Sequence, residues 1–463
     1  MSTVKAQQNT LLEGPLFKKI LLFVLPLMLT NLLQMLYNAA DMIVVGMSPV
    51  EGALGAIGTT GAMINLVINV FIGFSVGANV VVARWIGAGE EENTRRAVHT
   101  AMCVAVVFGI LGCVIGQIVC RPILILLGDE GHILELAVLY SRIYFAGAPF
   151  MAVTNFCIAI LRAKGDTKTP LFVLSLSGLV NVGLNLFFVK ACHMSVDGVS
   201  LATALSNVLS SIILIRKLSR EDSWCRFEFR RLRIHMRAFG DILYVGIPAA
   251  LQSALFSISN MLIQSSITGI NNRLYPGGSA VIDGNAAAGN LEGFCYTATN
   301  SVHQASVTFT SQHYGAGKIK RISSVMKNCY IISCIIAMTC AGTILLFQKP
   351  LVGLYVDDPG AFEAASIRNS IMLTTYFFLA LMEIGTGLLR GLGKSVTSTV
   401  ISLFGACAFR VVWILWVFPR FNSLQSIYLS YPISWALTAV VGFAFFIHYW
   451  KKELRKRRTP VSC

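Results

Sequence analysis

Long apolar runs recur along the whole chain, separated by short polar or Gly/Pro-rich breaks. About 20 apolar residues in a helix cross a hydrocarbon core of roughly 30 Å. The ~10-residue alternation typical of transmembrane β-strands does not occur in this sequence. The pattern predicts an all-α polytopic membrane protein with twelve transmembrane helices. Their expected bounds are 17–46, 54–83, 94–119, 133–160, 169–190, 196–216, 238–268, 284–312, 322–347, 362–388, 395–418 and 424–450.

The composition agrees with a membrane protein and argues against an enzyme. The 463 residues are 55% hydrophobic and 13% charged, whereas soluble domains average about 25% charged residues. The sequence has neither HExxH nor a GxxxxGK[ST] phosphate loop, which argues against a metalloprotease and a nucleotide-driven pump. Its twelve cysteines are scattered singly and indicate small buried apolar residues rather than metal ligands or disulfides. We expect no enzymatic activity and no cofactor.

Positive charge is concentrated in alternate loops. Of the 37 Lys and Arg residues, 29 lie near the N-terminus, in the even-numbered loops or near the C-terminus. The positive-inside rule therefore predicts that both termini and the linker at 216–237 are cytoplasmic. The expected location is the cell inner (cytoplasmic) membrane. Basic loops also account for the net charge of +15, so the lipid bilayer rather than nucleic acid is the expected partner. We expect a monomer.

The two halves of the chain share short motifs. IGAG at 86–89 is echoed by YGAG at 314–317, and LRAKG at 161–165 by LRGLG at 389–393. The shift from 86 to 314 equals that from 161 to 389, and we call this common shift the repeat offset. It indicates an internal repeat of six helices. Glycine suits these loops because it accepts positive φ, and Arg162 and Arg390 are expected to anchor helix ends at the lipid surface.

An even number of helices per repeat predicts two six-helix lobes related by a pseudo-two-fold axis along the membrane normal, with a cavity between them. The expected divisions are an N-terminal lobe (1–216), a basic cytoplasmic linker (217–237) and a C-terminal lobe (238–463).

The motifs resemble those of the multidrug and toxic compound extrusion (MATE) transporters of bacteria. The resemblance covers essentially the whole chain and rests on PLMLTNLLQMLYNAADMIVVG, GANVVVARWIGAGEEENTRRA, LRAKGDTKTP, SVTFTSQHYGAGK and LLRGLGKS. It implies two lobes that rock about a central cavity. It also implies export of bulky, often cationic compounds in exchange for Na⁺ or H⁺.

Asp41 is the outstanding ionisable residue in the first half, because an acid within a spanning helix indicates a functional site. Asn181 and Asn185 are four residues apart and share one face of the fifth helix. At about 1.5 Å of rise per residue, these residues and Thr203 fall in the outer half of the first lobe and can converge. The resemblance places the family's first-lobe cation site at these four positions, where carboxylate, amide and hydroxyl oxygens would bind Na⁺ or the carboxylate would bind H⁺. The alternative interpretation is an interfacial acid capped by its neighbours.

Other candidates for substrate binding or coupling are Glu292, Glu383, Arg410, Tyr37 and His303. Glu292 and Arg410 lie at similar heights, so the sequence allows a buried ion pair between them. The second half does not repeat the polar residues of the fifth helix, because Asn181 and Asn185 become Phe409 and Trp413 one repeat offset later. We therefore expect coupling to be concentrated in the first lobe.

Two functions fit this pattern. The first is a Na⁺- or H⁺-coupled antiporter that exports bulky organic cations by alternating access. The second is a flippase for a lipid-linked precursor, which would need several basic residues for the phosphate. Arg410 is the one basic residue deep within a predicted span, so export is preferred.

Overall fold

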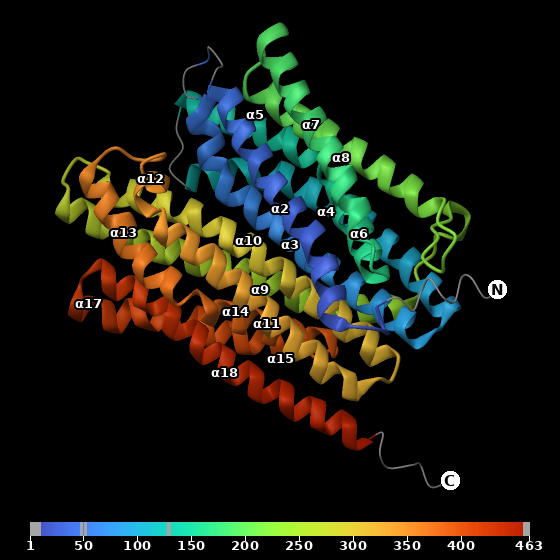
Figure 1. Cartoon of the computed structure of the whole chain (residues 1–463). Coiled ribbons are helices and arrows are strands. Elements are labelled where there is room, and N and C mark those ends of the chain that lie inside the picture. Colours follow the sequence, from blue (N-terminus) through green and yellow to red (C-terminus); the bar gives the residue numbers. More distant parts are fainter. Residues whose placement is uncertain (1–10, 47–49, 51–52, 127–130, 457–463) are drawn as a thin grey trace. The chain divides into compact units, whose positions relative to one another are not determined.

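All twelve predicted helical segments are present in a computed structural model, which describes residues 11–46, 50, 53–126 and 131–456 (Figure 1). The first half contains α2 (Leu16–Gly46), α3 (Ala53–Ala88), α4 (Glu91–Leu126), α5 (Gly131–Ala146), α6 (Ala148–Lys164), α7 (Lys168–Leu186), η1 (Phe187–Ala191) and α8 (Val196–Ser219). The rest of the chain contains η2 (Phe229–Arg231), α9 (Met236–Leu274), α10 (Ala280–Gly315), α11 (Ile319–Leu346), α12 (Gln348–Val352), α13 (Pro359–Thr374), α14 (Tyr376–Gly391), α15 (Ser395–Ser402), η3 (Leu403–Ala408), α16 (Phe409–Val412), η4 (Trp413–Val417), α17 (Phe418–Phe421) and α18 (Leu424–Lys456). The end segments 1–10 and 457–463, on which the orientation prediction partly depends, lie outside the described residues.

Two of the predicted helices are broken rather than continuous. The segment predicted at 133–160 is α5 followed by α6, bent by 48° at Gly147. The segment predicted at 362–388 is α13 followed by α14, bent by 51° at Thr375. Pro149, with no N–H to donate, explains the first bend. At the second bend the Thr375 hydroxyl donates to the Ile371 carbonyl at 2.7 Å.

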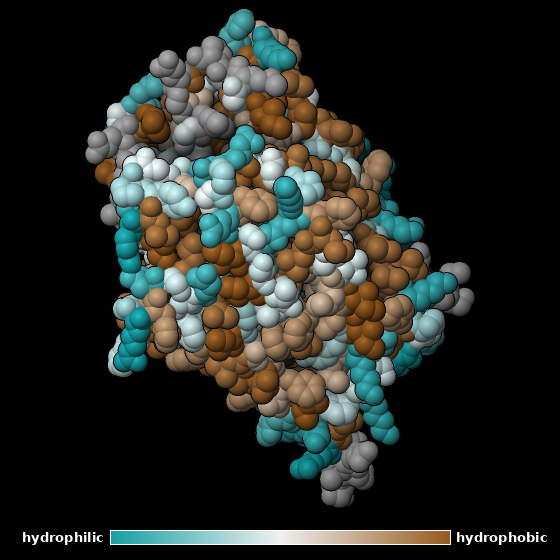
Figure 2. Space-filling view, turned by 60° about the vertical axis from the view of Figure 1, so that its left-hand side comes forward, coloured by the Kyte–Doolittle hydropathy of each residue, from teal (hydrophilic) through white to brown (hydrophobic). Residues whose placement is uncertain are grey.

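Most of the described helices are long and apolar enough to cross a membrane. Within the described ranges nine helices meet this test alone, and the two bent pairs meet it as broken spans. Apolar side chains accordingly cover much of the face seen in Figure 2. The remaining predicted segment is α10, which is too polar to pass. Many of its polar side chains point into the protein, where residues such as Thr299, Ser306 and Gln312 are fully buried.

The internal repeat extends beyond the two motifs to the geometry of the helices. Gly89 and Gly317 have φ of +75° and +72°, and Gly165 and Gly393 have φ of +103° and +77°. The members of each pair are one repeat offset apart, so the prediction of glycine turns with positive φ is confirmed. The two helix breaks, at Gly147 and Thr375, are separated by the same offset.

The residues group by contact into two units. The first consists of Met1–Leu12 and Leu25–Ala250, and the second of Glu13–Val24 and Leu251–Cys463. The linker therefore packs with the first unit. Helix α2 changes unit directly before Pro26, and α9 changes unit just after Pro248.

A polar network ties together helices of the second unit. The Arg368 guanidinium on α13 donates to Glu292 of α10 at 2.6 Å and to the side-chain oxygen of Asn285 at 2.7 Å. The Tyr428 hydroxyl on α18 donates to the same oxygen at 3.1 Å, and Asn285 donates to Gln264 of α9 at 2.8 Å. The charged side chains of Arg368 and Glu292 are only 14% and 16% exposed, so the network is an internal connection between four helices.

We predict that Glu292→Gln destabilises the protein, because it leaves the Arg368 charge without a carboxylate partner in a largely apolar interior. Breaking a buried pair in this way costs roughly 3–5 kcal/mol, and thermal unfolding of the purified protein in detergent measures the loss. Removing both charges in Glu292→Gln/Arg368→Gln should restore part of the stability. The exposed Glu363 provides a control, Glu363→Gln. Equal melting temperatures for wild type and Glu292→Gln would contradict this account.

Candidate functional site

The C-terminal part of α2 lies very close to α7 because a glycine of α7, Gly178, faces it. A Cβ atom at Gly178 would lie 1.9 Å from the ring of Tyr37, so no larger residue fits there without displacing the ring. The Tyr37 hydroxyl donates to the carbonyl of Ser175 at 3.1 Å and fixes the contact. Asp41 is one helical turn beyond Tyr37, and Asn185 is two turns beyond Gly178. The close approach therefore brings the carboxylate of α2 to the amides of α7.

A continuous chain of hydrogen bonds joins the four predicted cation-site residues. The Asn185 amide donates to Asp41 Oδ1 at 2.5 Å and lies 3.4 Å from Asn181 Oδ1. The Asn181 amide donates to Thr203 Oγ1 at 3.3 Å. In turn the Thr203 hydroxyl donates to the Val199 carbonyl at 3.1 Å. The structure thus brings together Asp41, Asn181, Asn185 and Thr203 from α2, α7 and α8, all within the first unit.

The burial and donor atoms of this cluster suit a small cation. Asn185 is fully buried and Asn181 is 6% exposed, whereas Asp41 is half-buried. The side-chain oxygen of Asn185 is buried and accepts no hydrogen bond from any described residue. An amide can turn over to exchange its oxygen and nitrogen. Carboxylate, amide and hydroxyl oxygens are ligands that hard cations prefer, and the same carboxylate can instead take a proton.

Sequence reasoning missed two tyrosines beside this cluster. Tyr140 and Tyr144 on α5 lie near enough to Asp41 to interact electrostatically with it. Their rings are stacked with centroids 6.2 Å apart. The signal was present in the sequence, because the two tyrosines are four residues apart and so share a helix face.

The corresponding place in the second unit is aromatic. Phe409 and Trp413, which follow Asn181 and Asn185 by the repeat offset, have ring centroids 5.8 Å apart. Gly269 and Tyr431 occupy the positions equivalent to Asp41 and Thr203. The two units therefore differ in chemistry at equivalent positions.

Glu292 and Arg410 do not form the ion pair that the sequence allowed. Glu292 is bound to Arg368. Arg410 is 3% exposed; its Nε donates to Ser434 at 2.9 Å, and its guanidinium lies 4.1 Å from the centre of the Tyr431 ring. Heights estimated along single helices did not reveal the partner of Glu292. Arg368 lies on another helix, α13, and its long side chain reaches across to Glu292.

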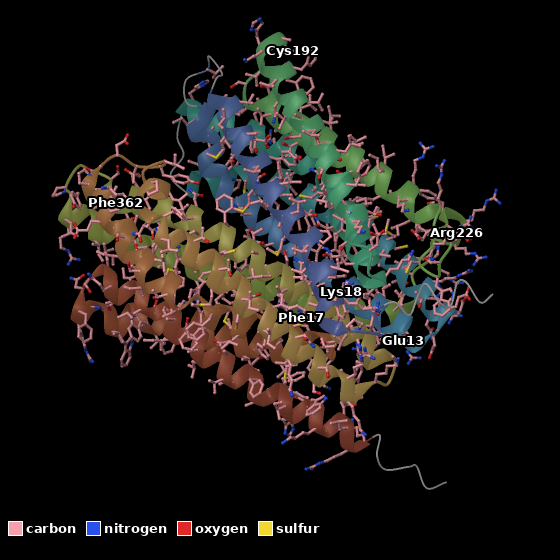
Figure 3. The ribbon with its side chains drawn as sticks, viewed as in Figure 1. Glu13, Phe17, Lys18, Cys192, Arg226 and Phe362 are labelled. Atoms are coloured by element: carbon pink, nitrogen blue, oxygen red, sulfur yellow. The ribbon has the colours of Figure 1, made fainter. Side chains whose placement is uncertain are left out.

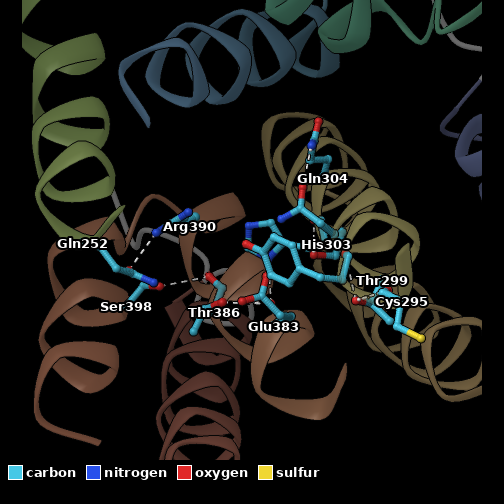
Figure 4. A network of polar contacts seen from close by, with 12 residues as sticks. Gln252, Cys295, Thr299, His303, Gln304, Glu383, Thr386, Arg390 and Ser398 are labelled. Atoms are coloured by element: carbon cyan, nitrogen blue, oxygen red, sulfur yellow. Dashed lines mark hydrogen bonds and ion pairs between the residues drawn. The ribbon is translucent and has the colours of Figure 1, made fainter. Parts of the chain in front are cut away.

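A second titratable cluster lies between α10 and α14 of the second unit (Figure 4). His303 Nδ1 donates to the backbone carbonyl of Glu383 at 2.7 Å and lies 3.5 Å from the Glu383 carboxylate. Arg390 donates to Gln252 at 2.7 Å. With 7% exposure, Arg390 is buried, so the expectation that it anchors a helix end at the lipid surface is wrong. Figure 4 shows Glu383 between His303 and the α14 residues Thr386 and Arg390.

The chain matches a known transporter family over most of its length. The family model described as MatE matches residues 26–187 and 248–416. Among similar proteins, "Probable multidrug resistance protein YoeA" of Bacillus subtilis is 24% identical over 93% of this chain and 94% of its own length. "Probable multidrug resistance protein NorM" of Thermotoga maritima is 26% identical over 83% of this chain and 82% of its own length.

Solved structures show the same fold. The crystal structure of a MATE protein in the bent conformation has a TM-score of 0.88 at 22% identity, covering 98% of this chain and 99% of that one. An outward-facing multidrug resistance MATE transporter of the MOP superfamily has a TM-score of 0.87 at 21% identity, covering 96% of this chain and 98% of that one. The chain therefore belongs to the MatE family, whose members are membrane transporters and not enzymes.

Proposed function

We propose that this transporter exports bulky organic cations, drugs or metabolites, in exchange for Na⁺ or H⁺ by alternating access. The multidrug resistance names of its relatives support the substrate class. The observation that carries the coupling proposal is the hydrogen-bonded cluster of Asp41, Asn181, Asn185 and Thr203 inside the first unit.

In this proposal Asp41 supplies the negative charge that holds the ion. In the structure its carboxylate accepts from the Asn185 amide, a bond strengthened by the charge. A bound Na⁺ would draw the amide oxygens of Asn181 and Asn185 toward itself, and a bound proton would neutralise Asp41. Either event changes the hydrogen bond between Asp41 of α2 and Asn185 of α7. Ion binding can then shift the conformational equilibrium, provided that the ion's affinity differs between the two conformations.

The cluster of His303, Glu383 and Arg390 is our second candidate for substrate binding or coupling. Glu383 is largely buried beside an imidazole and a guanidinium. Its carboxylate can attract a cation or exchange a proton with His303. Glu292 is a weaker candidate because its carboxylate is already occupied by Arg368.

The flippase remains the alternative function. Arg390 is buried in addition to Arg410, and Arg368 is largely buried, so the second unit buries more basic residues than the one expected from the sequence. Each has a local partner, however: Arg368 is paired with Glu292, Arg390 with Gln252 and Arg410 with Ser434. These partners favour a structural role over phosphate binding, so we retain the export function.

We further propose that the protein is a monomer with both termini in the cytoplasm. Cys192 is exposed in the turn between η1 and α8, and Figure 3 shows it at one end of α8 with Arg226 beyond the other. The basic residues that follow α8 favour a cytoplasmic location for that end. Cys192 would then face outward.

We predict that Asp41→Asn abolishes gradient-driven transport and leaves folding intact, because the amide keeps the shape of the side chain but loses the charge. The measurement is efflux of a fluorescent cation from proteoliposomes with a Na⁺ gradient or a pH gradient imposed separately. The gradient that drives the wild type identifies the coupling ion. Glu383→Gln in the same assay tests the second cluster. Unchanged driven transport by Asp41→Asn would overturn the site assignment.

We predict that Gly178→Ala weakens coupling although every ion ligand is retained. The new methyl group would push the Tyr37 ring away and draw Asp41 from Asn185. Overpacking of this kind costs about 1–3 kcal/mol, so the apparent ion affinity should fall roughly tenfold. Gly183→Ala on the same helix is the matched control, because a Cβ at Gly183 meets nothing within 4 Å. Similar ion affinities for the two variants would argue against the close α2–α7 contact.

We predict that a membrane-impermeant maleimide labels Cys192 in intact cells and that Cys192→Ser removes this labelling. Burial raises the pKa of Cys225 in the linker to about 12, so this thiol has almost no reactive thiolate at neutral pH and adds no background. Labelling of Cys192 only after permeabilisation would reverse the proposed orientation.

A further inference from the structure

The segment between α8 and α9 combines arginines with outward-facing apolar side chains. Residues 226–237, RFEFRRLRIHMR, contain five arginines and one acid. Four large apolar side chains among them are exposed: Phe229 at 68%, Leu232 at 44%, Ile234 at 39% and Met236 at 76%. We call residues 226–237 the arginine segment.

Contacts on either side fix the conformation of this segment. The N–H of Glu228 donates to His99 Nε2 at 3.1 Å, and the N–H of His235 donates to Thr100 Oγ1 at 3.1 Å, so both ends are tied to α4. Phe227 is 3% exposed and its N–H donates to the Leu218 carbonyl at 3.0 Å. Glu221 just before the segment is ion-paired with Lys164. Because the backbone is held in this way, the apolar side chains are presented outward rather than folded onto the protein.

The charges of the segment are only partly neutralised. Glu228, its one acid, lies 2.8 Å from Arg231 and 3.7 Å from Arg226. No carboxylate of a described residue lies within ion-pair distance of Arg230 or Arg233. On neighbouring α4 the arginines are already paired, Arg95 with Glu91 and Arg96 with Glu92. The surface therefore presents a net positive charge beside exposed apolar area.

The segment also lies where a bilayer surface is expected. It joins the end of one spanning helix, α8, to the start of another, α9. The Arg237 guanidinium lies 5.9 Å from the centre of the Trp85 ring, near the end of α3. Tryptophan gathers at the boundary between headgroups and acyl chains. An anionic phospholipid fits this surface, because its headgroup carries negative charge and its acyl chains supply apolar contact at the headgroup boundary.

We propose that the arginine segment binds anionic phospholipid, with Arg230 and Arg233 at the phosphates and Phe229, Leu232, Ile234 and Met236 in the upper acyl region. Basic residues near an anionic leaflet and apolar side chains at the interface both favour such binding. The inference does not depend on the coupling ion or the exported substrate. Since the segment connects the last helix of one half of the chain to the first helix of the other, the lipid would hold this connection at the membrane surface.

The test uses the full chain carrying Phe229→Trp, reconstituted in nanodiscs of phosphatidylcholine and phosphatidylglycerol. In one sample only the phosphatidylglycerol is brominated on its acyl chains, and in the other only the phosphatidylcholine. The fluorescence of the wild type, measured in parallel, is subtracted. We expect stronger quenching by the brominated phosphatidylglycerol, because the anionic lipid is enriched around the segment. Adding Arg230→Gln and Arg233→Gln should reduce this enrichment by roughly fivefold for each arginine removed.

Lys451→Gln/Lys452→Gln is the matched control, since these exposed residues near the end of α18 carry the same charge and belong to the other contact unit. This variant should keep the preference for phosphatidylglycerol. Equal quenching by the two lipids in the parent, or a preference that survives loss of both arginines, would overturn the proposal. Absence of quenching by either lipid would mean that the side chain at position 229 lies in water and would favour a soluble acidic partner, which also overturns it.

Discussion

The candidate site depends on one close contact, that of Tyr37 with Gly178. A charged carboxylate in a spanning helix is costly unless polar groups surround it. Asp41 obtains its partner, the Asn185 amide, only because α2 approaches α7 to within the space left by a missing side chain. From that contact the hydrogen bonds run on through Asn181 to Thr203 and bring in a third helix. The packing of Tyr37 against Gly178 thus helps to determine whether the charge of Asp41 can be tolerated in the helix.

The two repeats share a backbone plan, but their polar and charged residues stand at different positions. Where the first unit has Asn181 and Asn185, the second has the neighbouring rings of Phe409 and Trp413. Where the second unit has the Glu292–Arg368 pair, the equivalent residues of the first are Ile64 and Tyr140. The bends and glycine turns that recur in both units belong to the shared plan. Duplicated geometry therefore does not imply duplicated chemistry, and a site in one unit cannot be transferred to the other by the repeat.

The features that follow from periodicity and local spacing could be predicted from the sequence. The first helix was expected at 17–46 and occupies Leu16–Gly46, and the four cation-site candidates converge as their depths suggested. What depends on side-chain reach could not be predicted. Arg368 extends to Glu292 from a different helix than expected, and Arg390 turns into the protein from a motif that was expected at the surface. The helix breaks were also missed. The run through Thr375 stays apolar on both sides, whereas Gly147 and Pro149 were a signal for the first bend that went unused.

Helix α2 has a second property that bears on coupling, since its two parts belong to different contact units. Residues Glu13–Val24 group with the second unit, and those from Leu25 onward, including Asp41, group with the first. Pro26 stands directly after this change and removes one hydrogen bond from the helix ladder. Bending α2 therefore costs least close to the point where its contacts change from one unit to the other. In the proposed mechanism an ion bound at Asp41 would act on the part of α2 beyond Pro26, where it would alter the bond to α7. A local change in that bond would then act on a helix that can bend without unfolding, and it would favour one conformation to the extent that the ion binds the two conformations with different affinity.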